Sequence, residues 1–118
     1  MDHHKLVLPE HMNHHGSLFG GYLLKWIDEF AYITANIEFP GNRFVTIALD
    51  NVIFKHHIAC GQILCFAVKK TRLGTTSLDY SVEVYGERGA GAEKGIMFET
   101  KITFVAVSKD GTKKPLVA

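Results

Sequence analysis

The sequence has few cysteines, no excess of charge of one sign and no long apolar run. Cys60 and Cys65 do not form a Cys-x-x-Cys pair and cannot build a disulfide framework, so we expect reduced thiols in a cytoplasmic protein. The 13 basic and 12 acidic residues leave a net charge of +1, which argues against nucleic acid or a membrane as a partner. The longest apolar stretches fall far short of the roughly 18 residues of a membrane span, and no signal peptide opens the chain.

Internal repeats, low-complexity segments and linkers are also missing, and the length of 118 residues fits one domain over residues 1–118. A chain of this size buries only about two-thirds of the surface that its unfolded form exposes. A core shared between two copies would therefore help to stabilise it.

One long helix is predicted over residues 18 to about 38, and it would extend about 30 Å. Ser17 is its expected N-cap, and Pro40-Gly41 follows its end. Apolar residues lie on nearly every face of this helix: Tyr22, Leu23, Leu24, Trp26, Ile27, Phe30, Ala31, Ile33 and Ala35. Such a pattern is typical of a buried helix.

The rest of the sequence has the pattern of strands, predicted at residues 5–8, 44–54, 62–70, 77–85 and 96–107. Turns are expected at Leu73-Gly74 and Asp110-Gly111. Short connections between sequential strands imply an antiparallel sheet. The predicted fold class is α+β, with one sheet wrapped around one long buried helix. Because the helix is apolar on more sides than one sheet can cover, we expect its remaining face to meet a second copy of the chain.

Asp28 is the most informative residue, because it lies inside this apolar helix, between Ile27 and Glu29. A carboxylate is rarely buried unless it is paired or functional, and removal from water would make it a stronger base. The spacing alone equally allows Asp28 to face solvent or to pair with Lys25.

Gly20 and Gly21 stand at the start of the predicted helix, where free N–H groups can stabilise a developing oxyanion. The same glycines could instead serve only the tight packing of a strand on the helix. Asn13 precedes them in a polar loop, and its amide can bind a carbonyl oxygen or orient a water. On local grounds, a turn-forming role for Asn13 is the commoner one.

Histidines and basic residues offer weaker signals. His11, His14 and His15 cluster in the loop, but their spacing matches no zinc pattern, so we expect no metal and interpret them as loop residues near the site. No Gly-x-Ser-x-Gly motif supports a serine triad. Basic residues flank the strand ends, where they favour either a solvated edge or phosphate contacts to a nucleotide-like ligand: Lys55, Lys69, Lys70, Arg72, Arg88, Lys113 and Lys114.

Residues 8–21 and 24–29 together closely resemble the opening of the hot-dog-fold acyl-CoA hydrolases, namely the YciA-like bacterial enzymes and the cytosolic acyl-CoA thioesterases. In that family a proline and a polar loop with an asparagine precede Gly-x-x-Phe-Gly-Gly and an apolar helix with Met-Asp or Ile-Asp. Residues 50–55, 73–77 and 104–107 also match, so the resemblance covers nearly the whole chain. One departure is Lys55-His56-His57, where family members often have Lys-Pro.

The resemblance implies hydrolysis of acyl-CoA to a free acid and CoA, without a metal or other cofactor. It implies that Asp28 is the general base or nucleophile, that Asn13 is the loop amide, and that the backbone near Gly20 and Gly21 forms the oxyanion site. The expected CoA contacts are Lys55, Arg72, Thr75, Thr76, Ser77 and Arg88. It also implies homodimers assembled as trimers of dimers.

Helix geometry adds a constraint, because Asp28 lies eight residues beyond Gly20, or about 12 Å along the axis. One thioester carbonyl cannot easily touch both within one chain. Two such helices packed antiparallel would bring Asp28 of one chain to Asn13 and Gly21 of the other, so we predict composite sites at a dimer interface.

Two other functions are alternatives to hydrolysis. A non-catalytic acyl-CoA-binding or regulatory module remains the alternative, although the presence of both Asp28 and Asn13 argues against it. A hot-dog dehydratase would need a His-Phe-Pro-like motif, which the sequence lacks. The preferred acyl length is not predicted, because the aromatic residues that would line a tunnel could equally be core: Phe19, Tyr22, Trp26 and Phe54.

Overall fold

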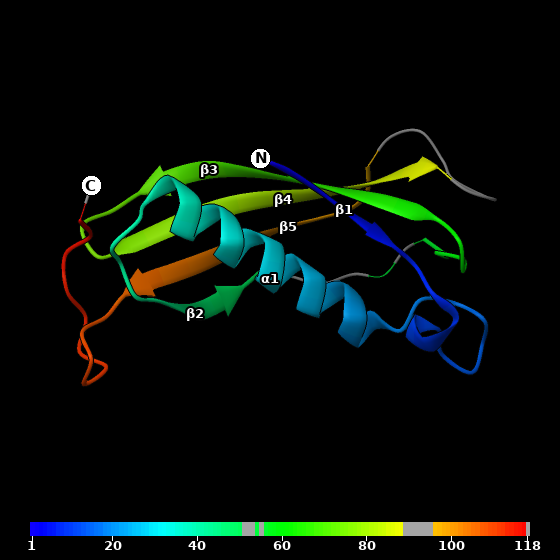
Figure 1. Cartoon of the computed structure of the whole chain (residues 1–118), viewed down its shortest axis with the longest axis horizontal. Helices are drawn as coiled ribbons and strands as arrows, with labels where there is room; N and C mark the ends of the chain where they lie inside the picture. Colours follow the sequence, from blue (N-terminus) through cyan, green and yellow to red (C-terminus); the bar gives the residue numbers. More distant parts are fainter. Residues whose placement is uncertain (51–53, 55, 89–95, 118) are drawn as a thin grey trace.

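A computed structural model has one long helix lying along one face of a five-stranded sheet (Figure 1). It describes residues 1–50, 54, 56–88 and 96–117. The elements are β1 (Asp2–Leu6), a short 3-10 turn η1 (Pro9–His11), α1 (Gly20–Glu38), β2 (Phe44–Leu49), β3 (Ile63–Leu73), β4 (Ser77–Arg88) and β5 (Ile96–Ala106).

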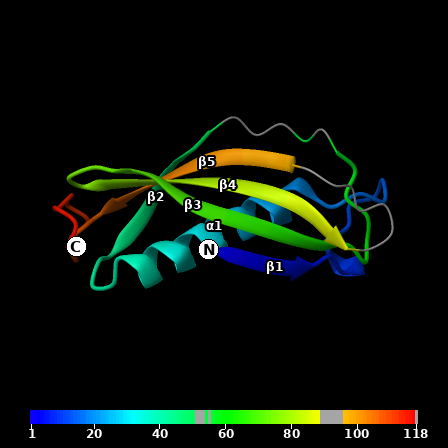
Figure 2. The ribbon, with the colours of Figure 1, turned by 90° about the horizontal axis from the view of Figure 1, so that it is seen from above.

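The sheet has the strand order β1-β3-β4-β5-β2, and every neighbouring pair is antiparallel. Figure 2 shows the strands lying over α1, with β1 and β2 as the two edges. The predicted α+β class, with an antiparallel sheet around one long helix, is therefore confirmed.

The core lies between α1 and the inner face of the sheet. On β4 the alternating residues Leu78, Tyr80, Val82 and Val84 are fully buried, as their period of two predicts. On α1 a stripe at four-residue spacing is buried against them: Leu23, Ile27, Ala31 and Ala35. The periodicities of strand and helix thus meet in one hydrophobic core.

The opposite side of α1 is exposed in the single chain, where Tyr32, Ile33 and Ile37 reach solvent. The edge strand β2 continues this apolar surface, since Val45 is 46% exposed and Ile47 is 54% exposed. One sheet indeed covers only one side of the helix. That a second copy covers the rest stays a prediction.

Element ends differ from the predicted ones at several points. The helix begins at Gly20 rather than at residue 18, and its N-cap is Phe19 without a side-chain cap, so the prediction of Ser17 as N-cap is wrong. The reason is tertiary: Leu18 pairs with Met12 in an isolated bridge and donates its N–H to the Ile58 carbonyl, which keeps this stretch extended.

The strands also differ in length from those that the sequence predicts. β1 covers Asp2–Leu6 instead of residues 5–8, because Pro9 starts the turn η1. β3 and β4 run further than predicted, and a register shift between Lys70 and Arg72 lets them continue. β2 ends at Leu49, and part of its predicted extension, residues 51–53, lies outside the described residues. The turn at Asp110-Gly111 is confirmed, with Gly111 at a φ of 88°.

Candidate active site

The loop from Asn13 to Ser17 precedes α1 and is closed on itself. The Asn13 Oδ1 accepts hydrogen bonds from the backbone N–H groups of His15 (2.9 Å) and Ser17 (3.1 Å). The Asn13 N–H in turn donates to the Ser17 carbonyl at 2.7 Å. Gly16, at a φ of 78°, takes the left-handed conformation that glycine adopts readily.

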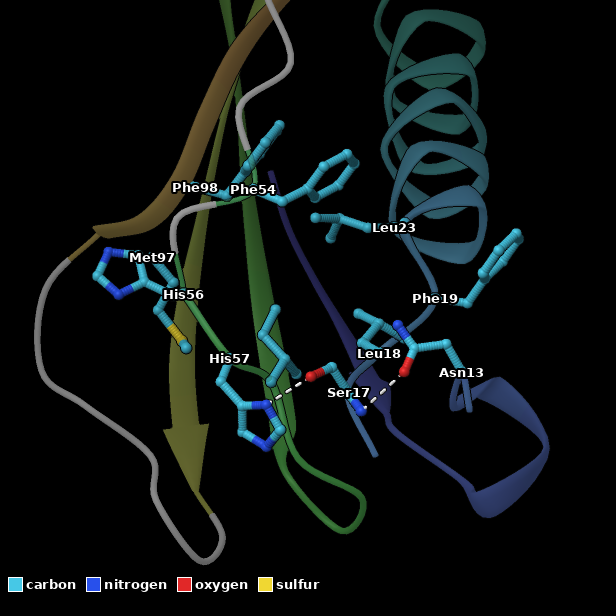
Figure 3. Close-up of a pocket in the computed structure, with 12 residues that line it drawn as sticks. Asn13, Ser17, Leu18, Phe19, Leu23, Phe54, His56, His57, Met97 and Phe98 are labelled. Atoms are coloured by element: carbon cyan, nitrogen blue, oxygen red, sulfur yellow. Dashed lines mark hydrogen bonds between the residues drawn. The ribbon is translucent and has the colours of Figure 1, made fainter. Parts of the chain in front are cut away.

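The two roles expected for Asn13, forming the turn and binding a ligand, would use different atoms of its side-chain amide. The oxygen makes the turn, which leaves the Nδ2 group as a hydrogen-bond donor. Figure 3 shows this nitrogen directed away from Ser17 and toward the start of α1. A donor in this position suits a ligand carbonyl oxygen.

Gly20 and Gly21 allow two aromatic rings to approach the start of α1. A Cβ added at Gly20 would lie 2.8 Å from Cζ of Phe54, and one at Gly21 would lie 2.7 Å from Cε2 of Phe19. The glycines therefore serve close packing, although the partners are rings rather than a strand. The first N–H groups of a helix have no acceptor within it, and here Tyr22 uses the Phe19 carbonyl (3.0 Å). The N–H groups of Gly20 and Gly21 remain the candidates for an oxyanion site.

A cavity of about 500 Å³ opens beside this helix start (Figure 3). Its apolar wall contains Phe54 and Phe98, whose stacked rings lie 5.7 Å apart between centroids. The full lining is Asn13, Ser17, Leu18, Phe19, Gly20, Leu23, Phe54, His56, His57, Ile58, Met97 and Phe98. The pocket thus combines a few polar groups with an apolar surface that suits a hydrocarbon chain.

Asp28 does not line this pocket. It is exposed in the single chain, so of the two arrangements left open by the sequence, burial within one chain is wrong and the solvent-facing one is correct. Its Oδ1 accepts a hydrogen bond from Thr46 Oγ1 on β2 at 2.7 Å, and within the described residues no ion pair with Lys25 forms. Asp28 and Thr46 lie in a shallow groove of about 460 Å³, together with Lys25, Glu29, Tyr32, Phe44 and Val45.

Thr46 is a candidate site residue that the sequence did not indicate. A threonine in a strand is ordinary, and nothing in the local sequence connects it to a residue 18 positions earlier. The contact arises because β2 lies along the helix as an edge strand.

The expected CoA contacts are not brought together in one chain. Arg72, Thr75, Thr76 and Ser77 lie around the turn between β3 and β4, at the end of the molecule where α1 ends (Figure 1). Arg88 ends β4, eleven residues beyond Ser77 or roughly 36 Å in an extended strand, and its side chain is not described. Lys55 lies outside the described residues. Their role in CoA binding stays a prediction.

The loop histidines have separate surroundings. His11 is buried, accepts the Leu8 N–H on its Nδ1 at 2.9 Å and contacts the rings of Tyr22 and Trp26. His14 and His15 are exposed and lie against each other, with ring centroids 3.9 Å apart. Among the residues that the structure describes, no three His, Cys, Asp or Glu side chains are placed to hold a metal ion.

A single long helix under a curled antiparallel sheet is the arrangement of the hot-dog fold, and solved structures of that fold match this one. A hexameric thioesterase from Yersinia pestis superposes with a TM-score of 0.88 at 27% identity, over 98% of this chain and 93% of that one. An acyl-CoA hydrolase from Staphylococcus aureus, solved with butyryl coenzyme A, gives 0.85 at 31% identity, over 98% and 70%.

Sequence comparisons agree with the structural ones. The acyl-CoA thioester hydrolase YciA of Salmonella typhimurium is 31% identical over 94% of this chain and 85% of its own length. Mouse acyl-coenzyme A thioesterase 11 is 35% identical over 86% of this chain, which spans only 17% of that longer protein. The family model of the thioesterase superfamily matches residues 15–93, and the chain belongs to this family. In the described part of the chain, no helix is long and apolar enough to cross a membrane.

Proposed function

We propose that this chain is an acyl-CoA thioesterase, which hydrolyses acyl-CoA to a free carboxylic acid and CoA. The observation that carries the proposal is the pocket at the start of α1, where a donor amide, helix-start N–H groups and an apolar wall adjoin. A thioester presents a carbonyl oxygen next to an acyl chain, which is the combination that such a pocket fits. The names of the similar proteins support the same reaction.

In the proposed reaction, the Asp28 carboxylate takes a proton from a water as the water oxygen bonds to the thioester carbon. The Gly20 and Gly21 N–H groups, with the Asn13 amide, stabilise the negative charge on the carbonyl oxygen. The carbon–sulfur bond then breaks, and the CoA thiolate takes up the proton held by Asp28. Alternatively, the carboxylate itself attacks the thioester carbon and forms an anhydride as the carbon–sulfur bond breaks and the CoA thiolate leaves. Water then opens the anhydride, which releases the acid, regenerates the Asp28 carboxylate and supplies the proton for the thiolate. Neither route requires a metal or cofactor.

Thr46 positions the carboxylate in this scheme. Its hydroxyl donates to one oxygen of Asp28 at 2.7 Å and leaves the second oxygen for the water or the thioester carbon. A non-catalytic acyl-CoA-binding module, the alternative, has no use for a carboxylate held in this way.

The site is proposed to form between two chains. Asp28 opens onto a groove beside the exposed residues Tyr32 and Val45. The pocket that contains Asn13 lies at the start of α1, about 12 Å from Asp28 along the helix. Antiparallel packing of two helices would join the groove of one chain to the pocket of the other. The similar proteins include hexamers, which is consistent with a trimer of dimers.

Release of free thiol from short, medium and long acyl-CoAs tests the activity and its chain-length preference. We expect Asp28→Ala to reduce kcat by at least about a hundredfold, the lower end of what a positioned base contributes. Glu99→Gln, which changes an exposed carboxylate on β5, is the matched control and should retain wild-type activity. Hydrolysis at the wild-type rate by Asp28→Ala would contradict the assigned role, and CoA binding without any turnover by the unmodified protein would favour the binding module.

A further inference from the structure

A hydrogen bond between Ser17 Oγ and His57 Nδ1, 2.5 Å long, joins two sides of the pocket mouth (Figure 3). Ser17 belongs to the loop that carries Asn13, whereas His57 comes from the segment that leads into β3. The two residues are 40 positions apart in the sequence. His57 also lies where this chain departs from the Lys-Pro of similar sequences, so the resemblance assigns it no role.

We propose that His57 is a positioning residue for hydrolysis, which holds the Asn13 amide in place by anchoring Ser17. This inference rests on the proposed function and extends it. Ser17 is bonded to Asn13 twice, because its N–H donates to Asn13 Oδ1 at 3.1 Å and its carbonyl accepts the Asn13 N–H at 2.7 Å. Any displacement of Ser17 therefore moves the Asn13 amide with it.

The anchor consists of two adjacent contacts. Beside the Ser17–His57 bond, the Leu18 N–H donates to the Ile58 carbonyl at 2.9 Å. The backbone contact does not depend on which side chains are present, whereas the side-chain contact needs both Ser17 and His57. Loss of the imidazole should thus leave the loop attached at Leu18 and free Ser17 to move.

Because this contact is partly exposed, its loss should lower turnover with little effect on the stability of the fold. Ser17 is half-buried and His57 is exposed, so losing their hydrogen bond leaves no buried polar group without water. We therefore expect a change in kcat without a comparable change in thermal stability.

A competing interpretation is that His57 activates Ser17 as a nucleophile. A serine–histidine pair within hydrogen-bond distance is the first part of a catalytic triad, but in the described part of the chain no carboxylate bonds to the His57 ring. The two interpretations differ in the expected effect of Ser17→Ala. This change would abolish turnover if Ser17 attacked the thioester, whereas it would only loosen the loop if Ser17 is an anchor.

The test compares His57→Ala, Ser17→Ala, their double variant and His57→Asn in steady-state hydrolysis of one acyl-CoA. We expect each single change to lower kcat about threefold to tenfold, the factor that corresponds to one net hydrogen bond, with little change in KM. The double variant should lose no more than either single variant, because both remove the same contact. His57→Asn, whose amide can replace Nδ1, should recover most of the rate. His4→Ala, which removes an exposed imidazole on β1 outside the pocket lining, is the control.

A second measurement does not depend on turnover. In ¹⁵N-labelled protein, the side-chain NH₂ signals of Asn13, assigned by their loss in Asn13→Ala, should shift and broaden in His57→Ala and stay unchanged in His4→Ala. Unchanged Asn13 signals in His57→Ala, additive losses in the double variant, or complete inactivity of Ser17→Ala alone would each overturn the inference. Absence of hydrolysis by the unmodified protein would instead contradict the proposed function, while the Asn13 signals would still decide the positioning role.

Discussion

Gly20 leaves space at the start of α1 that the Phe54 ring occupies, and its substitution tests the pocket directly. A Cβ at this position would lie 2.8 Å from the ring, which is 53% exposed and would have to move aside. Alanine is favoured over glycine in a helix by about 0.5–1 kcal/mol. We expect Gly20→Ala to keep or slightly raise the melting temperature and to lose at least about tenfold in kcat/KM, because the ring moves within the pocket wall.

Thermal unfolding and thiol release, measured on the same preparation, check this prediction. Asn36→Ala, a change in the second half of α1 away from the pocket, provides the control for helix substitution. A Gly20→Ala protein that is destabilised yet fully active would show that the glycine serves folding and not the site.

The candidate site residues that the sequence indicates lie within one continuous motif. Asn13, Gly20 and Asp28 stand out because their spacing relative to the helix is local information. Thr46 and His57 could not be predicted, since their partners Asp28 and Ser17 lie 18 and 40 positions away and meet them only in the folded chain. Whether Asp28 faces the core or the solvent was equally beyond reach, because helical periodicity does not say which apolar side the sheet covers.

At the scale of elements, Tyr80 fastens the end of α1 to the middle of the sheet. Its hydroxyl donates to Glu38 Oε1 at 2.8 Å, and burial together with this carboxylate raises the pKa of Tyr80 above its ordinary value. The folded state therefore holds this proton more tightly than the unfolded state. Its contribution to stability is complete below the ordinary tyrosine pKa of about 10 and is lost as the pH rises above that value.

We expect Tyr80→Phe to cost about 1 kcal/mol of unfolding free energy at pH 8, because the partly buried hydrogen bond to Glu38 is lost. Above pH 10 the variant should lose stability less steeply than the unmodified protein, so the difference between them narrows. Urea unfolding at pH 8, 10 and 11 measures this. Tyr32→Phe, which changes an exposed tyrosine on α1, is the control. A difference that widens with pH would contradict the assignment.

Element order and type followed from the sequence, but element ends did not. The alternation of β4 predicted its buried face correctly because every second residue is apolar. The start of α1 was misplaced by two residues because Ser17, a good N-cap by type, is engaged with Asn13 and His57 instead. A local capping preference of about 1 kcal/mol is easily outweighed by several tertiary hydrogen bonds.

At the scale of the whole molecule, the single chain separates Asp28 from the proposed oxyanion donors at Gly20 and Gly21 by about 12 Å of helix. It also leaves apolar side chains of α1 and β2 exposed, namely Ile33, Ile37, Val45 and Ile47. A symmetric dimer would explain both features. A two-fold axis beside β2 would bury these side chains and bring Asp28 of one chain to Asn13 of the other. In a dimer of this kind each chain supplies opposite halves of two equivalent sites.

Subunit mixing decides whether the sites are shared. If Asp28→Ala and Asn13→Ala chains are refolded together in equal amounts, half of the dimers contain one of each, and in these one site has both mutations while the other has none. Activity should then recover to about one-quarter of the wild-type value, although each parent protein is nearly inactive. Mixing Asp28→Ala with Thr46→Ala chains is the matched control, because these two residues bond within one chain and no intact site can form. Recovery in the first mixture alone requires a composite site, whereas equal results in both mixtures would place the whole reaction within a single chain.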